Sequence, residues 1–64
     1  MNEAMKDKNG RILKIGDKLV DAKGKLSRLE NICGVTMLRD LKNSKCTIIR
    51  KVDMSTLEYT DEIP

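Results

Sequence analysis

The chain of 64 residues has no histidine, tryptophan or phenylalanine, and Tyr59 is its single aromatic residue. The absence of histidine removes the side chain that most often transfers protons near neutral pH. The near absence of aromatic rings removes the stacking surfaces on which proteins hold single-stranded nucleic acid. Both absences argue against an enzyme and against a single-strand binder.

Cysteine is also scarce, since Cys33 and Cys46 are the only two and form no C-x-x-C pair. Two cysteines are too few for the disulfide scaffold of a small secreted domain, and their spacing does not match a zinc site. Asp17 and Asp21 lack the spacing of a calcium-binding loop and are interpreted as turn residues. We therefore expect reduced, packed thiols, and neither a metal nor a cofactor.

Long apolar runs are missing as well. No stretch approaches the ~20 apolar residues that a membrane span needs, and the first eight residues are mostly polar. Together with reduced cysteines, this pattern predicts a cytoplasmic protein that does not contact a membrane. A chain of this length has room for one domain with one small core, built from Leu, Ile, Val and Met.

What the sequence does contain is a series of short apolar segments separated by glycine and asparagine turns. Alternation over residues 35–40 and 46–51, with a polar loop at 41–44, predicts two strands of one hairpin. Shorter strands are expected at 11–15 and 19–20 because each is a brief apolar segment next to a turn.

Residues 26–33 allow two interpretations. Leu26, Leu29 and Ile32 have the spacing of an amphipathic helix, but the stretch covers only about two turns and lies between two glycines. We therefore predict a strand here, with a short helix, and hence an α+β fold, as the alternative.

The C-terminal part is expected to form one helical turn and a last strand. The helical turn is predicted over residues 53–58, with Asp53 or Ser55 as its cap and Leu57 packed against the core. A final short strand is expected at 59–63.

These segments together predict a mostly β fold, a small barrel of about five short strands with one helical turn near the C-terminus. The single domain is expected to span residues 9–64, after a flexible lead-in at residues 1–8, where the sequence is polar and shows no periodicity.

One segment of the expected domain carries a family resemblance. From Asn9 to Leu19 the sequence is N-G-R-I-L-K-I-G-D-K-L, and a glycine turn follows at Gly24. This segment resembles the opening of small SH3-like barrel proteins with a KOW-like first hairpin, and Gly16 and Asp17 match the turn of that layout. The resemblance implies an SH3-like barrel of the kind found in short bacterial and phage-encoded chains. It also implies binding of RNA, ribosomal components or transcription proteins, which are partners of KOW-like domains.

Charge is unevenly distributed along the chain. All 13 basic residues fall within residues 1–52 with six of the ten acidic residues, so this part carries +7 and the last twelve residues carry −4. A basic body with an acidic tail indicates an acidic partner or a tail that offsets the charge of the body. An unevenly charged, solvated surface is the plain alternative.

The candidate binding residues are the basic side chains of two expected hairpins. The first hairpin contributes Lys18, Lys23, Lys25 and Arg28. The second contributes Arg39, Lys42, Lys45, Arg50 and Lys51. If the barrel closes, both groups are expected to meet one phosphate track.

Two functions fit this surface. In the first, the chain is a non-catalytic interaction module, of phage or mobile-element type, that docks on a host protein through its barrel surface. Met37, Met54 or Leu41 would then supply the apolar centre of the contact. In the second, it is a KOW-like barrel that binds structured or double-stranded nucleic acid through phosphate contacts. A homodimer formed through an exposed strand edge is compatible with either function.

Overall fold

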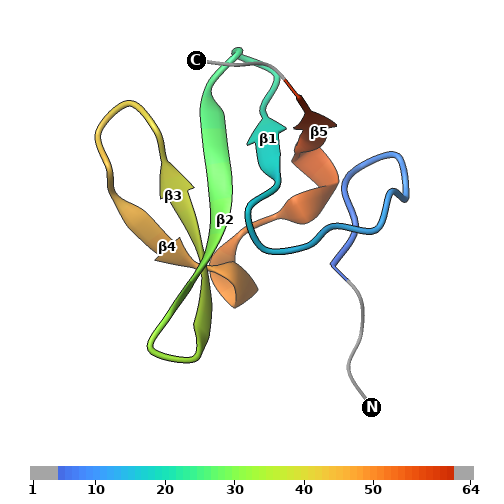
Figure 1. Ribbon diagram of the computed structural model, residues 1–64. Coiled ribbons are helices and arrows are strands. Elements are labelled where there is room, and N and C mark those ends of the chain that lie inside the picture. Colours follow the sequence, from blue (N-terminus) through green and yellow to red (C-terminus); the bar gives the residue numbers. More distant parts are fainter. Residues whose placement is uncertain (1–4, 62–64) are drawn as a thin grey trace.

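The computed structural model describes residues 5–61 and shows one antiparallel sheet of five strands (Figure 1). The strands, in chain order, are β1 (Lys18–Val20), β2 (Leu26–Ile32), β3 (Val35–Asp40), β4 (Cys46–Ile48) and β5 (Glu58–Thr60). Two 3₁₀ turns, η1 (Ile49–Lys51) and η2 (Met54–Thr56), connect β4 to β5. The mostly β fold with about five short strands is confirmed.

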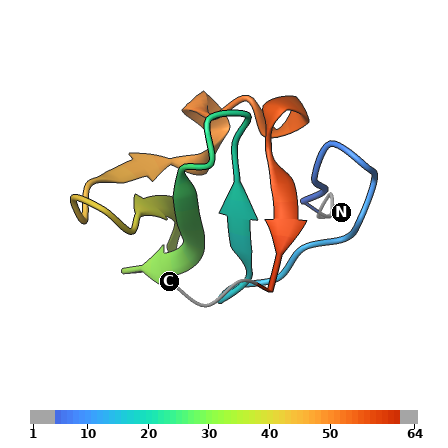
Figure 2. The same cartoon turned by 90° about the horizontal axis from the view of Figure 1, so that it is seen from above.

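The order of the strands in the sheet is β4-β3-β2-β1-β5, so the last strand returns to pair with the first. Val20 pairs with Glu58 and Lys18 with Thr60 across β1 and β5. Consecutive strands otherwise pair as hairpins, and Figure 2 shows the sheet curling from β4 round to β5. This small β-rich fold is consistent with an SH3-like barrel.

The alternative of a helix at residues 26–33 is wrong, because most of this segment is the strand β2. Strand β2 is hydrogen-bonded on both sides, to β1 and to β3, so its backbone groups find partners without a helix. Ser27 and Leu29 are buried on one face of the sheet, while Leu26 and Arg28 lie on the other and are only half-buried. The true period is therefore two, and the helical spacing of the leucines is incidental.

The strand expected at residues 11–15 is wrong. Only one isolated bridge forms here, between Lys6 and Ile12. The rest of the segment is a loop. In it the backbone N–H of Leu13 donates to the carbonyl of Met5 at 2.7 Å, and the Leu13 side chain is buried. The strand was predicted because Ile12 and its neighbours are apolar, but Ile12 is 66% exposed and does not belong to a buried strand.

The second strand of the predicted hairpin is shorter than expected. Strand β4 ends at Ile48, and residues 49–51 form η1, closed by a hydrogen bond from the N–H of Val52 to the carbonyl of Ile49. The helical turn predicted after residue 52 is confirmed as η2, which Asp53 caps by accepting a hydrogen bond from the N–H of Ser55.

Among the described residues, four buried leucines form the core: Leu13, Leu19, Leu29 and Leu57. Leu19 and Leu29 have no exposed surface, and burying a leucine side chain contributes roughly 1.5–3 kcal/mol. The buried position of Leu57 confirms that the residue after η2 packs into the core. Half-buried apolar side chains surround this cluster, among them Leu38 of β3 and Tyr59 of β5.

Residues 5–8, which we expected to precede the domain, make contacts with it. The N–H of Lys8 donates to the carbonyl of Leu57 at 2.8 Å, and Asp7 is buried. The side chain of Met5 packs against the leucine core. The rest of the expected lead-in, residues 1–4, lies outside the described residues, as do the last three residues of the acidic tail.

Candidate functional site

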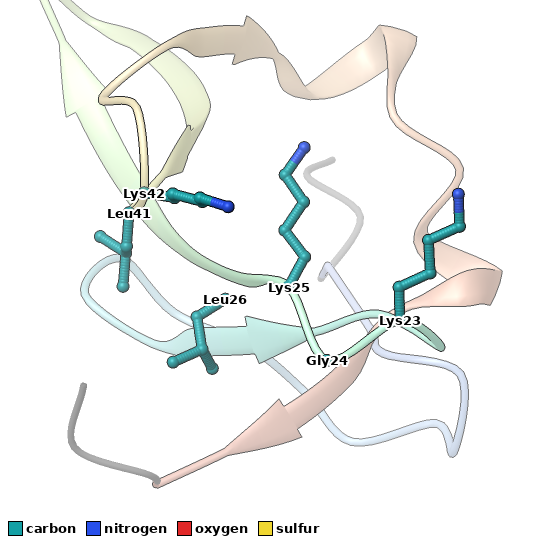
Figure 3. A pocket seen from close by; sticks show the side chains of 6 residues that line it. All are labelled: Lys23, Gly24, Lys25, Leu26, Leu41 and Lys42. Atoms are coloured by element: carbon teal, nitrogen blue, oxygen red, sulfur yellow. The ribbon is translucent and has the colours of Figure 1, made fainter.

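Two turns lie together at one end of the sheet, and a groove lies between them (Figure 3). Turn 21–25 leads into β2, and turn 41–45 follows β3. Because Ser27 pairs with Asp40, the start of β2 and the end of β3 are neighbours. The groove measures about 420 Å³ and is lined by Lys23, Gly24, Lys25, Leu26, Leu41 and Lys42.

An aspartate at the first position builds turn 21–25. One carboxylate oxygen of Asp21, Oδ1, accepts hydrogen bonds from the N–H groups of Lys23 and Lys25, both at 2.9 Å. The N–H of Gly24 donates to the carbonyl of Asp21, and Gly24 has φ +81°, which glycine adopts without strain. The backbone hydrogen bond from Lys25 is the largest cause that lowers the pKa of Asp21, so this carboxylate is charged. Asp21 is thus a turn residue, as the sequence predicted.

Asp40 builds the second turn in a similar way. Its Oδ1 accepts the N–H of Lys42 at 2.8 Å, and its carbonyl accepts the N–H of Ser44 at 2.7 Å. Its other carboxylate oxygen, Oδ2, lies 2.7 Å from the ammonium group of Lys25. This contact is the largest cause both of the lowered pKa of Asp40 and of the raised pKa of Lys25. Lys25 therefore ties the two turns together.

The other two lysines of the groove differ from Lys25 in their ion pairing. Lys23 and Lys42 are exposed, and within residues 5–61 neither forms an ion pair with a carboxylate. Figure 3 shows the Lys42 side chain lying across toward Lys25, while the side chains of Lys23 and Lys25 extend in a similar direction. The groove thus has two lysines without an ion pair among the described residues, and the charge of Lys23 contributes to the lowered pKa of the nearby Asp21.

Two leucines give the groove an apolar part. Leu26 and Leu41 are half-buried, and the N–H of Leu41 donates to the carbonyl of Leu26 at 3.1 Å. In Figure 3 both leucine side chains point the same way, away from the direction of Lys23 and Lys25. The apolar and the charged parts of the groove therefore lie side by side but are separate.

A second hollow of about 340 Å³ shares Lys25 with the groove. It is lined by Lys25, Ser27, Leu38, Asp40, Asn43, Lys45, Thr47 and Val52. Lys45, another predicted binding residue, thus lies beside this hollow rather than in the groove.

Three predicted binding residues share one face of the sheet, since Lys18 pairs with Arg28 and Arg28 with Arg39. Both arginines are held by Glu30. Arg28 Nη2 lies 2.7 Å from Glu30 Oε2, and Arg39 Nε lies 2.9 Å from Glu30 Oε1. The hydrogen bond from Arg28 is the largest cause of the lowered pKa of Glu30, followed by that from Arg39. One carboxylate therefore offsets part of the charge expected to meet phosphates.

The remaining predicted residues, Arg50 and Lys51, lie in η1, directly after β4. Turn 41–45 precedes β4, so these two residues and the groove are at opposite ends of that strand. Of the nine predicted binding residues, the structure thus brings Lys23 and Lys25 together with Lys42 in the groove. The other six predicted residues lie beside the second hollow, on the sheet face and in η1. What the sequence did not indicate was the place of Leu26 beside Leu41, which depends on the pairing of β2 with β3.

Neither cysteine forms a disulfide, but the expectation that both are packed is wrong. Cys33 is exposed and Cys46 is half-buried. Cys33 and Gly34 both have positive φ, at +52° and +80°, because they form the two-residue turn between β2 and β3. A turn of this kind leaves the Cys33 side chain in solvent.

The described part of the chain contains no group of three or more residues arranged to hold a metal ion. Within the same residues, no helix is long and apolar enough to cross a membrane. Comparison with known proteins gives no family model, curated protein or solved structure that matches the chain. The resemblance to KOW-like first hairpins therefore stays a prediction from the sequence.

Proposed function

We propose that the chain is a non-catalytic module that binds another protein through the groove between turns 21–25 and 41–45. The observation that carries this proposal is the combination of two lysines that form no ion pair within residues 5–61, Lys23 and Lys42, with two adjacent leucines. Protein interfaces combine an apolar centre with polar groups around it, and a basic surface selects an acidic partner.

Three features favour a protein over a nucleic acid as the partner. The turn amides that could bind a phosphate already donate to Asp21 and Asp40. Arg28 and Arg39 are paired with Glu30 on the sheet face. The ring of Tyr59, the single aromatic residue, lies 3.8 Å from the guanidinium of Arg11, which covers one of its faces. Few groups on this surface are therefore left to contact a row of phosphates or to stack against bases.

The proposal is tested by recovery of a complex from a nuclease-treated cell lysate, with the full chain as bait. A protein retained in stoichiometric amount after nuclease treatment and at moderate salt is the expected result. Recovery that is lost entirely on nuclease treatment, together with salt-sensitive retention of the bait on duplex DNA, would instead support the KOW-like nucleic-acid function.

A further inference from the structure

On the basis of this proposed function, we infer that the groove binds an extended acidic segment of the partner in which carboxylates lie next to an apolar side chain. The inference names the chemistry of the partner segment, and it comes from how the lining residues of the groove are arranged.

The apolar side chain of the segment is matched by Leu26 and Leu41. Both leucines are only half-buried, and the hydrogen bond between their backbones holds them side by side. The two leucines come from different elements on the two sides of the groove: Leu26 belongs to β2 and Leu41 to turn 41–45. An apolar side chain placed against this pair removes apolar surface from water on both partners, which favours binding.

The carboxylates of the segment are matched by the lysines. Lys23 and Lys42 come from opposite turns, and neither forms an ion pair with a carboxylate within residues 5–61. Lys25 lies between these turns and is held by Asp40 at 2.7 Å. Two lysines from two different turns, next to the leucine pair, thus match a segment that carries more than one acidic residue beside its apolar residue.

A nucleic acid fits the same groove less well. Phosphates could contact Lys23 and Lys42, but a sugar-phosphate backbone has no large apolar group to place against Leu26 and Leu41. The backbone N–H groups of Lys23, Lys25 and Lys42, the usual additional phosphate donors in such turns, already bind carboxylates. The groove is therefore better matched to a peptide.

The experiment uses three synthetic peptides and the full chain labelled with ¹⁵N, at moderate salt. The first peptide is Glu-Glu-Leu-Glu-Glu, the second has serine in place of leucine, and the third has lysine in place of each glutamate. We expect the first peptide to shift amide signals of residues 23–26 and 41–42. We expect the serine peptide to bind about tenfold more weakly because it loses the apolar contact, and the lysine peptide not to bind.

Two double variants separate a local contact from an effect of net charge. Lys23→Glu with Lys42→Glu should weaken binding of the leucine peptide by more than tenfold. Arg50→Glu with Lys51→Glu changes the net charge by the same amount at exposed positions in η1. Since charges more than ~8 Å apart are largely screened at 0.15 M salt, this control should bind within about twofold of the unchanged chain.

A matched pair of variants tests the apolar part. Leu41→Ser should reduce binding of the leucine peptide about as much as replacing its leucine does, whereas Ile12→Ser, at a 66% exposed position outside the groove, should leave it unchanged. Thermal unfolding of each variant shows that the domain is still folded.

Each other outcome overturns the inference in a distinguishable way. Equal binding of the leucine and serine peptides would remove the apolar contact, and shifts centred outside residues 23–26 and 41–42 would remove the groove. Displacement of the peptide by a short DNA duplex at lower concentration would make the groove a phosphate site.

If no peptide binds but a nuclease-resistant protein complex is still recovered, the inference fails and the proposed function stands; if that complex is also absent, both fail. If binding strengthens when residues 61–64 are deleted, the chain's own acidic tail, rather than a partner segment, is the occupant of the groove, and the inference fails.

Discussion

Residues 7–11 and 21–25 form turns of the same type, but the two copies of the turn have different surroundings. In each copy, the first aspartate accepts the N–H groups two and four residues later through Oδ1, at 2.9 Å. In each, its carbonyl accepts the N–H of the glycine three residues later, and the glycines have φ values of +82° and +81°. The local sequence D-x-[NK]-G-[RK] is therefore sufficient for the geometry of the turn.

The copies differ in what surrounds them. Asp7 is buried, and its second carboxylate oxygen, Oδ2, accepts the N–H of Tyr59 at 2.8 Å. The first turn thus holds the start of the described chain against β5. Asp21 is more exposed, and its turn carries Lys23 and Lys25 into the groove. The comparison shows that the same turn is a structural clasp where it meets an edge strand, and that where it meets another turn it lines the groove to which the proposed function is assigned.

Removal of the two aspartates should give the largest difference between the copies. Asp7→Ala is expected to lower the thermal unfolding midpoint at least twice as much as Asp21→Ala, because it also leaves the N–H of Tyr59 without its carboxylate partner. Circular dichroism on both variants measures this. Equal losses would show that residues 5–8 do not hold β5.

Acid unfolding should show the same difference at smaller size. The hydrogen bond from the N–H of Tyr59 is the largest cause that lowers the pKa of Asp7 from 3.8, and the stability it gives is present above that value. It is lost as the pH falls through the lowered pKa, because the unfolded chain then binds the proton more readily. Asp7→Asn should therefore flatten the fall in unfolding midpoint below about pH 4 more than Asp21→Asn does. A pH series from 6 to 2 tests this, and parallel curves would contradict it.

The two glycines should behave alike, which is the smallest expected difference. A Cβ built at Gly10 or Gly24 would meet no atom within 4 Å, so Gly10→Ala and Gly24→Ala should each cost only the left-handed backbone penalty of about 1 kcal/mol. The unfolding midpoints should fall by similar amounts, roughly 4–8 °C in a domain of this size. A much larger loss at Gly10 would indicate strain in the first turn that Gly24 does not share.

The sequence was sufficient for several elements whose determinants are local. The alternating pattern of the β3–β4 hairpin, the Asp53 cap of η2 and the turn role of Asp21 were predicted, because each depends on residues within a few positions of one another. The role of Asp7 was missed, since its decisive partner, Tyr59, is 52 residues away.

The candidate site was only partly predictable for the same reason. The basic residues were identified from charge, but the sequence did not show which of them form ion pairs. The carboxylates that pair with Lys25 and Arg39 lie on neighbouring strands, and the β2–β3 register brings them close. The apolar half of the groove likewise depends on that register, which brings Leu26 beside Leu41. Spacing along the chain contains no signal for such neighbours.

The most direct test of the central claim compares the two copies of the turn in the presence of a partner. A photoreactive benzoylphenylalanine is placed at Ala22 or at Lys8, which are exposed, equivalent second positions of the two turns. The account predicts that, in a nuclease-treated lysate, the residue at position 22 cross-links a protein and the residue at position 8 does not. Equal cross-linking from both positions, or cross-linking from position 8 alone, would contradict the division of the two turns into clasp and binding element.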